Sequence, residues 1–215
     1  MVRGVYMVDH TKDQKLGNML VSRRSLFDVR RMLDILFSLI LLVVLSPVLF
    51  ILMLLIKVES PGPIFYRQER VGLYGKTFII TKLRSMRVDA EKKGPQIAAK
   101  NDPRVTRVGW FMRRTRLDEW PQLLNVLRGE MHLVGPRPER PMFTQQYARK
   151  IMGFKNRLKV RPGLTGWAQI NGGNDVTILE KYKLDMYYIY NRSLLLDLKI
   201  LFITIWIVFS GSGAR

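Results

Sequence analysis

Two adjacent carboxylates occupy the segment of the chain with the most reactive side chains. Asp118 and Glu119 follow a basic run that includes Arg113, and Pro121 comes three residues after Asp118. Because proline is tolerated in the first turn of a helix and glycine suits its end, the spacing predicts a helix from about Asp118 to Gly129. The positive end of the helix dipole and the nearby arginines would both favour ionised carboxylates.

This carboxylate pair is compatible with two kinds of chemistry and with a purely structural role. An ionised aspartate can act as a nucleophile on phosphorus. Two adjacent carboxylates beside phosphate oxygens can hold Mg²⁺, which prefers oxygen ligands. Alternatively, Asp118 is only an N-cap and Glu119 only a first-turn acid, which is the commoner meaning of Asp-Glu at a helix start.

Three further segments carry groups that suit phosphate or nucleotide binding. Lys82 and Arg84 alternate after an apolar run, which predicts a clamp for a diphosphate on one face of a strand. Prolines flank Arg137 within residues 135–141, so its stiffened guanidinium suits bidentate phosphate binding, although a polyproline docking peptide fits equally well. The glycine-rich segment 161–172 either lines a nucleotide or sugar pocket or is a structural loop.

The composition limits the classes of partner and chemistry. The 215 residues suit one domain, and 36 Lys and Arg against 17 Asp and Glu give a formal net charge of +19. Such an excess attracts nucleic acid, anionic lipid or phosphorylated substrates. The absence of cysteine excludes disulfides, zinc–thiolate sites and thiol catalysis, and two histidines argue against a histidine-based triad or metal site.

A long apolar segment predicts insertion into a membrane. Residues 35–56 carry no charge over 22 positions, which is enough to cross a hydrocarbon core. Ser46-Pro47 lies near its middle and predicts a kink or break, with the Ser46 hydroxyl bonded to a freed backbone carbonyl. Basic residues stand on both flanks, which favours a helix that enters and leaves by one face over a kinked spanning helix.

The remaining pattern predicts a mainly α fold with a small β-hairpin, in the α+β class. Short apolar runs around a turn at 72–75 predict the hairpin. A basic helix with Trp110 that opens at Asp102-Pro103, and an apolar helix at 194–209, suit the membrane interface around a cytoplasmic active site. We predict three regions: a flexible tail at 1–22, an interfacial entry and membrane helix at 23–57, and a catalytic domain at 58–215.

Seven motifs taken together resemble the bacterial sugar transferase family, also called monotopic phosphoglycosyl transferases. The similarity runs from about Arg24 to the C-terminus, and the motifs stand in the family's order. One departure is Trp120, where leucine is usual. The matching segments are the Ser46-Pro47 membrane segment, 82–86, 102–109, 117–126, 135–139, 161–169 and 196–200.

The resemblance implies an enzyme on the cytoplasmic face of the bacterial inner membrane, anchored in membrane lipids by a re-entrant helix. It would transfer a sugar 1-phosphate from a UDP-sugar to undecaprenyl or another polyprenyl phosphate and release UMP. In the family's mechanism Asp118 is the nucleophile and forms a phosphosugar–enzyme. Glu119 is then a metal ligand or acid–base helper, and Mg²⁺ is the cofactor bound at the pair. Such a step begins the synthesis of exopolysaccharide, capsule, O-antigen or glycoprotein glycans.

The same resemblance gives roles to four more residues. Lys82, Arg113 and Arg137 would contact phosphate, and Asp197 matches another functional acid of the family. The sequence is also compatible with a homodimer, and it does not identify the sugar.

Two functions of other classes compete with this one. The net charge of +19 fits a membrane-anchored nucleic-acid-binding protein, although the sequence lacks a helix-turn-helix or other reader motif, so we expect no nucleic-acid partner. A non-enzymatic assembly scaffold would use residues 135–141 as its docking peptide and would release no UMP from any UDP-sugar.

Overall fold

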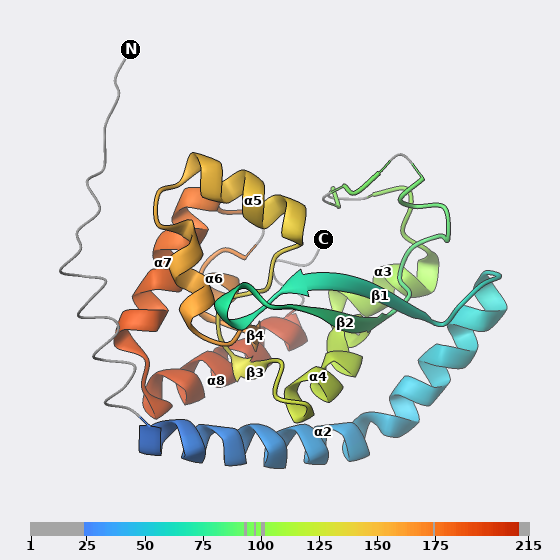
Figure 1. Cartoon of the computed structure of the whole chain (residues 1–215). Coiled ribbons are helices and arrows are strands. Elements are labelled where there is room, and N and C mark those ends of the chain that lie inside the picture. Colours follow the sequence, from blue (N-terminus) through green and yellow to red (C-terminus); the bar gives the residue numbers. More distant parts are fainter. Residues whose placement is uncertain (1–23, 93, 97, 100–101, 174, 211–215) are drawn as a thin grey trace.

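The computed structural model describes residues 24–92, 94–96, 98–99, 102–173 and 175–210. One long helix, α2 (Arg24–Glu59), runs along one side of the molecule, and the other elements lie together beside it (Figure 1). The predicted tail at 1–22 lies outside the described residues. The remaining α-helices are α3 (Arg107–Arg114), α4 (Leu123–Leu127), α5 (Pro141–Lys150), α6 (Trp167–Ile170), α7 (Ile178–Asn191) and α8 (Leu194–Ser210). Short 3₁₀ helices are η1 (Leu73–Gly75), η2 (Leu117–Gln122) and η3 (Phe154–Lys159).

In its N-terminal half, helix α2 turns polar residues toward the rest of the chain, whereas much of its apolar surface is exposed. Arg30, Asp34 and Ser38 recur every fourth position and are buried against the rest of the chain. Val43 and Val44 are instead 72% and 64% exposed. The span Val29–Glu59 has a mean hydropathy of 3.3 in its most apolar window, of which only 11% is buried, and among the described residues no other helix is long and apolar enough to cross a membrane. Because a helix in water shows the opposite polarity, this surface suits lipid.

The helix bends but stays helical through Pro47, as Figure 1 shows. Proline lacks the N–H that would bond the carbonyl four residues earlier, which is that of Val43. The Ser46 hydroxyl donates to this same Val43 oxygen at 2.8 Å. The predicted kink and its serine hydrogen bond are therefore confirmed.

Two small sheets accompany the helices, so the predicted mainly helical α+β class is confirmed. Strands β1 (Phe65–Val71) and β2 (Thr77–Leu83) form the predicted antiparallel hairpin. Strands β3 (His132–Val134) and β4 (Gly163–Thr165) pair in parallel, which the sequence did not predict. Three residues a strand are too few to produce a readable alternation of apolar and polar positions.

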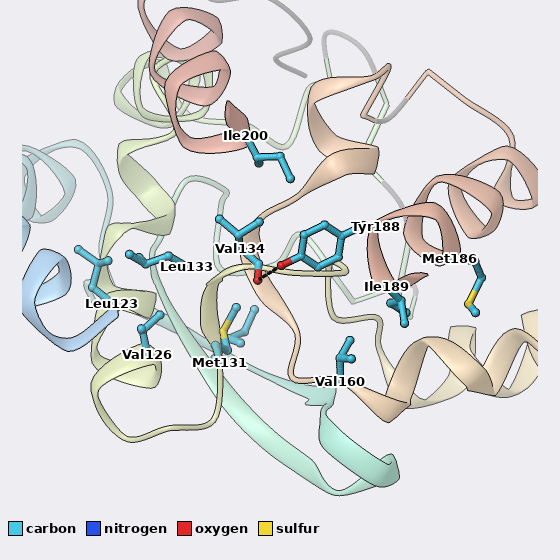
Figure 2. Close-up of a cluster of buried hydrophobic side chains, with 11 residues drawn as sticks. Leu123, Val126, Met131, Leu133, Val134, Val160, Met186, Tyr188, Ile189 and Ile200 are labelled. Carbon is cyan, nitrogen blue, oxygen red and sulfur yellow. Dashed lines mark hydrogen bonds between the residues drawn. The ribbon is translucent and has the colours of Figure 1, made fainter. Parts of the chain in front are cut away.

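The main core joins the helices of the C-terminal half to β3 (Figure 2). Tyr188 of α7 is 1% exposed and donates its hydroxyl to the Val134 carbonyl oxygen at 3.1 Å. Ile200 of α8 is fully buried in the same cluster. A smaller cluster joins the far half of α2 to β2 and α3 through Leu52, Ile56, Leu83 and Met112.

Two further helices present apolar side chains to their surroundings. Trp110 of α3 is 54% exposed, and Phe202 and Trp206 of α8 are 76% and 73% exposed. Helix α3 begins at Arg107, later than predicted, because the Thr106 side chain accepts a hydrogen bond from the Gly109 N–H and so acts as its N-cap.

Candidate active site

The two carboxylates lie in the first turn of η2, which leads directly into α4. The predicted helix start near Asp118 is thus confirmed, although its opening turn is 3₁₀ and only the part from Leu123 is α-helical. Gly129 follows the end of α4 with φ of 80°, a left-handed conformation that glycine adopts without strain.

Helix α4, which continues η2, is fixed by contacts with two segments that are distant in the sequence. The buried Asn125 amide donates to the Ile79 carbonyl oxygen of β2 and to Glu130 Oε2, each at 2.7 Å. The Arg31 guanidinium of α2 donates to the Leu127 carbonyl oxygen at 2.6 Å, at the C-terminal end of α4. The helix that continues from the carboxylates is therefore held against both the hairpin and α2.

Glu119 is held between two cations. Lys82 Nζ donates to Glu119 Oε1 at 2.5 Å, and Arg137 bonds both carboxylate oxygens, with its Nη1 3.1 Å from Oε2. Burial alone would raise the pKa of Glu119, but Arg137 and Lys82 together hold this pKa well below its usual value. Glu119 thus stays ionised and is committed to its two partners.

Asp118 differs from Glu119 both in its hydrogen bonds and in the direction of its pKa shift. It is 7% exposed, and within the described part of the chain no hydrogen bond or ion pair ends on its carboxylate. Burial raises its pKa to about 6, although Lys82, Arg113 and Arg137 act in the opposite direction. The predicted effect of the arginines is present, but burial outweighs it. At neutral pH the group is a largely ionised carboxylate with free oxygens and raised basicity.

The loop that carries Arg137 is fixed through its backbone. Arg157 of η3 donates to the Arg137 carbonyl oxygen at 2.8 Å and pairs with the buried Asp185 at 2.6 Å. Arg70 of β1 donates to the Pro138 carbonyl oxygen at 2.9 Å. The loop therefore keeps one position, which favours a fixed guanidinium over a free docking peptide.

The glycine-rich segment supports this loop directly. A Cβ atom on Gly163 would lie 2.0 Å from the Gly135 nitrogen, and one on Gly166 would lie 2.1 Å from the Gly135 oxygen. Only glycine permits so close an approach of two backbones. This arrangement favours the structural interpretation of these glycines over a nucleotide pocket.

Not every predicted site residue joins this group. Arg84 follows the end of β2 and is buried, and it donates to the carbonyl oxygens of Ser60 and Pro61 at 2.8 and 3.0 Å. The predicted clamp of Lys82 with Arg84 does not form, because Arg84 instead fixes the turn after α2. Asp197 pairs with Arg30 of α2 at 3.1 Å.

Asp197 therefore has a place in the fold apart from the carboxylate pair. It also accepts a hydrogen bond from the Tyr188 hydroxyl at 2.7 Å. Through these contacts it joins α8 to α7 and to the N-terminal half of α2. The charged residues of the candidate site, whose charges act on Asp118, on Glu119 or on both, are Lys82, Arg113, Arg116 and Arg137.

Sequence reasoning missed two basic residues near this group. Arg116 lies two positions before Asp118, and its charge acts on both carboxylates. Arg70 of β1 is half-buried, and its pKa is lowered to about 10, mainly by desolvation and then by the charge of Arg137. The position of Arg116 could have indicated its role, whereas nothing local in the sequence distinguishes Arg70.

The carboxylate pair fits a magnesium ion only in part. The free oxygens of Asp118 are suitable hard ligands. Glu119 would have to release Lys82 or Arg137 to contribute, since both of its oxygens are bonded. The described residues contain no group of three or more His, Asp or Glu side chains placed to hold a metal. Mg²⁺ in phosphate-handling sites is typically bound by one or two carboxylates together with substrate phosphates. Asp118, alone or with Glu119, could provide these carboxylate ligands.

Comparison with known proteins gives a consistent picture. A family model described as bacterial sugar transferase matches residues 25–211. The UDP-N-acetylgalactosamine-undecaprenyl-phosphate N-acetylgalactosaminephosphotransferase of Aeromonas hydrophila is 44% identical over 217 aligned residues, covering 99% of this chain and 51% of that protein. The UDP-glucose:undecaprenyl-phosphate glucose-1-phosphate transferase of Escherichia coli (strain K12) is 45% identical over 191 residues, covering 86% of this chain and 41% of that protein.

A shorter relative is covered more fully. The UDP-glucose:undecaprenyl-phosphate glucose-1-phosphate transferase of Caulobacter vibrioides is 43% identical over 183 residues, covering 82% of this chain and 68% of that protein. The chain spans about half the length or less of the relatives from A. hydrophila and E. coli.

The raised pKa of Asp118 can be measured without metal or substrate. In protein with ¹³C-labelled aspartate carboxyls, the signal absent from Asp118→Asn should titrate near pH 6. Glu119→Gln removes a like charge and frees Lys82 and Arg137, so it should lower this midpoint. A midpoint near the ordinary aspartate value of about 4 in the unmodified protein would contradict the effect of burial.

Proposed function

This chain belongs to the bacterial sugar transferase family, and we propose that it transfers a sugar 1-phosphate from a UDP-sugar to undecaprenyl phosphate. The products are undecaprenyl-diphosphate-sugar and UMP, and the reaction would be the first membrane step of a bacterial polysaccharide or glycoprotein glycan. The names of the relatives from A. hydrophila and E. coli support this reaction class. The observation that carries the proposal is a contrast between two adjacent acids. Glu119 is bonded to Lys82 and Arg137, whereas the carboxylate oxygens of Asp118 are free.

The proposed reaction has two displacements on one phosphorus atom. In the first, an Asp118 oxygen attacks the β-phosphorus of the UDP-sugar, and the bond to the bridging oxygen breaks. UMP leaves with that oxygen and the electron pair, and the sugar phosphate remains on Asp118. In the second, an oxygen of undecaprenyl phosphate attacks the same phosphorus, and the Asp118 carboxylate leaves. No other reactant is needed, and the route is ping-pong.

The surrounding charges suit this chemistry. Negative charge must be stabilised on the phosphoryl oxygens and on the departing UMP, and positioned cations do this best in a buried site. Lys82, Arg113 and Arg137 are the cations whose charges already act on Asp118. Glu119 keeps Lys82 and Arg137 in place and balances their charge before substrate arrives. Its role in this scheme is to position those two cations.

A magnesium ion completes the proposal. Asp118, and Glu119 if it releases a cation, would hold it together with substrate phosphates. When bound, the ion would neutralise part of the diphosphate charge.

The acceptor explains why α2 should be re-entrant on the cytoplasmic face of the inner membrane. Arg30 and Ile56 both contact the same domain and lie 26 residues apart, which is about 39 Å along a helix. A hydrocarbon core is about 30 Å thick. A straight spanning helix could not keep both ends against one cytoplasmic domain, whereas a helix bent at Pro47 could. The active site would then lie at headgroup level, where the acceptor phosphate is.

Turnover tests the reaction directly. The unmodified protein should release UMP from at least one UDP-sugar when undecaprenyl phosphate and Mg²⁺ are present, and a chelator should stop it. Asp118→Asn should lower the rate by roughly a thousandfold or more because the nucleophile is lost, while membrane binding persists. Glu69→Gln, which removes an exposed carboxylate, is the control and should stay near the unmodified rate. No UMP release from any UDP-sugar would favour a non-enzymatic scaffold.

The topology of α2 can be read with single cysteines, because the chain has none of its own. Ser22→Cys precedes α2, and Lys155→Cys lies in the exposed part of η3. In inverted inner-membrane vesicles a membrane-impermeant maleimide should label both sites, and in intact spheroplasts it should label neither. Labelling of Ser22→Cys from the outside of spheroplasts would show that α2 spans the membrane.

A further inference from the structure

Arg116 has an unusual backbone conformation beside the proposed nucleophile. It stands at the N-cap of η2 with φ of 56° and ψ of 17°, in the left-handed region. For a residue other than glycine this conformation is strained. Among the described non-glycine residues, the only other positive φ belongs to Tyr74, in the turn of the hairpin. The Arg116 nitrogen donates to the Arg113 carbonyl oxygen at 3.3 Å, and its own oxygen accepts from the Glu119 N–H at 3.2 Å.

The side chain of Arg116 is available to a ligand. It is partly buried, and none of the hydrogen bonds or ion pairs found among the described residues involves its guanidinium. Lys82 and Arg137 are, in contrast, both bonded to Glu119. The Arg116 charge nevertheless acts on Glu119, Arg137 and Asp118, so the group belongs to the same centre.

The balance of charge at this centre favours an anion. Five cations act electrostatically on this centre or on one another, and three carboxylates oppose them, which leaves an excess of two positive charges. The cations are Lys82, Arg70, Arg113, Arg116 and Arg137, and the carboxylates are Asp118, Glu119 and Glu139. Arginine remains protonated at all relevant pH values, and its planar fork matches two phosphate oxygens. Burial of an unbalanced guanidinium is costly, and a bound phosphate group would remove that cost.

We propose that Arg116 is a further substrate-contacting residue, which binds phosphate oxygens in the reaction centre through its free guanidinium. The left-handed backbone at Arg116 connects the end of α3 to η2 two residues before Asp118, and the charge of this side chain acts on both carboxylates. The phosphate belongs either to the diphosphate of the donor or to the monoester of the lipid acceptor. This inference rests on the proposed function.

Four variants separate this role from a structural one. Arg116→Gln removes the charge, and Arg116→Lys keeps the charge but not the bidentate fork. Arg116→Gly removes the side chain and adopts the left-handed conformation without strain, so it should melt no lower than the unmodified protein. Arg128→Gln is the control, because it removes an equal charge from the exposed C-cap of α4.

The kinetic measurement is kcat/KM for each substrate, since in a two-step displacement each value reports its own half-reaction. Arg116→Gln and Arg116→Gly should each lower one or both values by about tenfold to a hundredfold, and Arg116→Lys should lose less. A loss confined to the UDP-sugar identifies the donor diphosphate, and a loss confined to undecaprenyl phosphate identifies the acceptor. Losses in both show that Arg116 serves both steps.

Unchanged kinetics of the Arg116 variants would contradict this role. If Arg116→Gly and Arg116→Gln stay within about twofold of Arg128→Gln for both substrates, Arg116 is not a substrate contact. That outcome leaves the proposed function intact, provided that the unmodified protein releases UMP. Absence of UMP release from the unmodified protein would instead remove the proposed function itself.

Discussion

The ion-paired clamp of Lys82 and Arg137 on Glu119 is the interaction on which the candidate site depends. The side chains of Glu119, Lys82 and Arg137 are 13%, 15% and 27% exposed, so removing any one of the three leaves unpaired charge in a partly desolvated place. The clamp also makes two neighbouring acids different. Glu119 is fully bonded and strongly ionised, while Asp118 keeps free oxygens and a raised pKa. One site thereby gains a fixed pair of cations and a basic carboxylate.

Three separate segments of the fold supply the three residues of the clamp. Lys82 comes from the hairpin, Glu119 from the turn between α3 and α4, and Arg137 from the loop after β3. Each segment has its own anchor: Asn125 joins α4 to β2, and the backbones of Gly135 and Gly163 meet at a separation that only glycine allows. Helix α2 contacts the same domain through Arg30 near one end and through Ile56 near the other.

Local signals in the sequence predicted much of this arrangement. The hairpin, the kink with its serine hydrogen bond and the helix start at the carboxylate pair each depend on a few neighbouring residues. What could not be predicted depends on long-range contacts. Arg84 lies two residues after Lys82, yet β2 ends between them and Arg84 bonds the turn after α2. Asp197 pairs with Arg30, 167 positions away, and no pattern in either segment indicates this.

The most direct test of the account is whether Asp118 forms a bond to phosphorus. The protein is incubated with a UDP-sugar that supports turnover, without acceptor, and its mass is then measured intact and after digestion. We predict a gain of one sugar phosphate, located on the peptide that contains Asp118 and absent from Asp118→Asn. No gain in mass under conditions where full turnover proceeds, or a gain on another residue, would contradict the account.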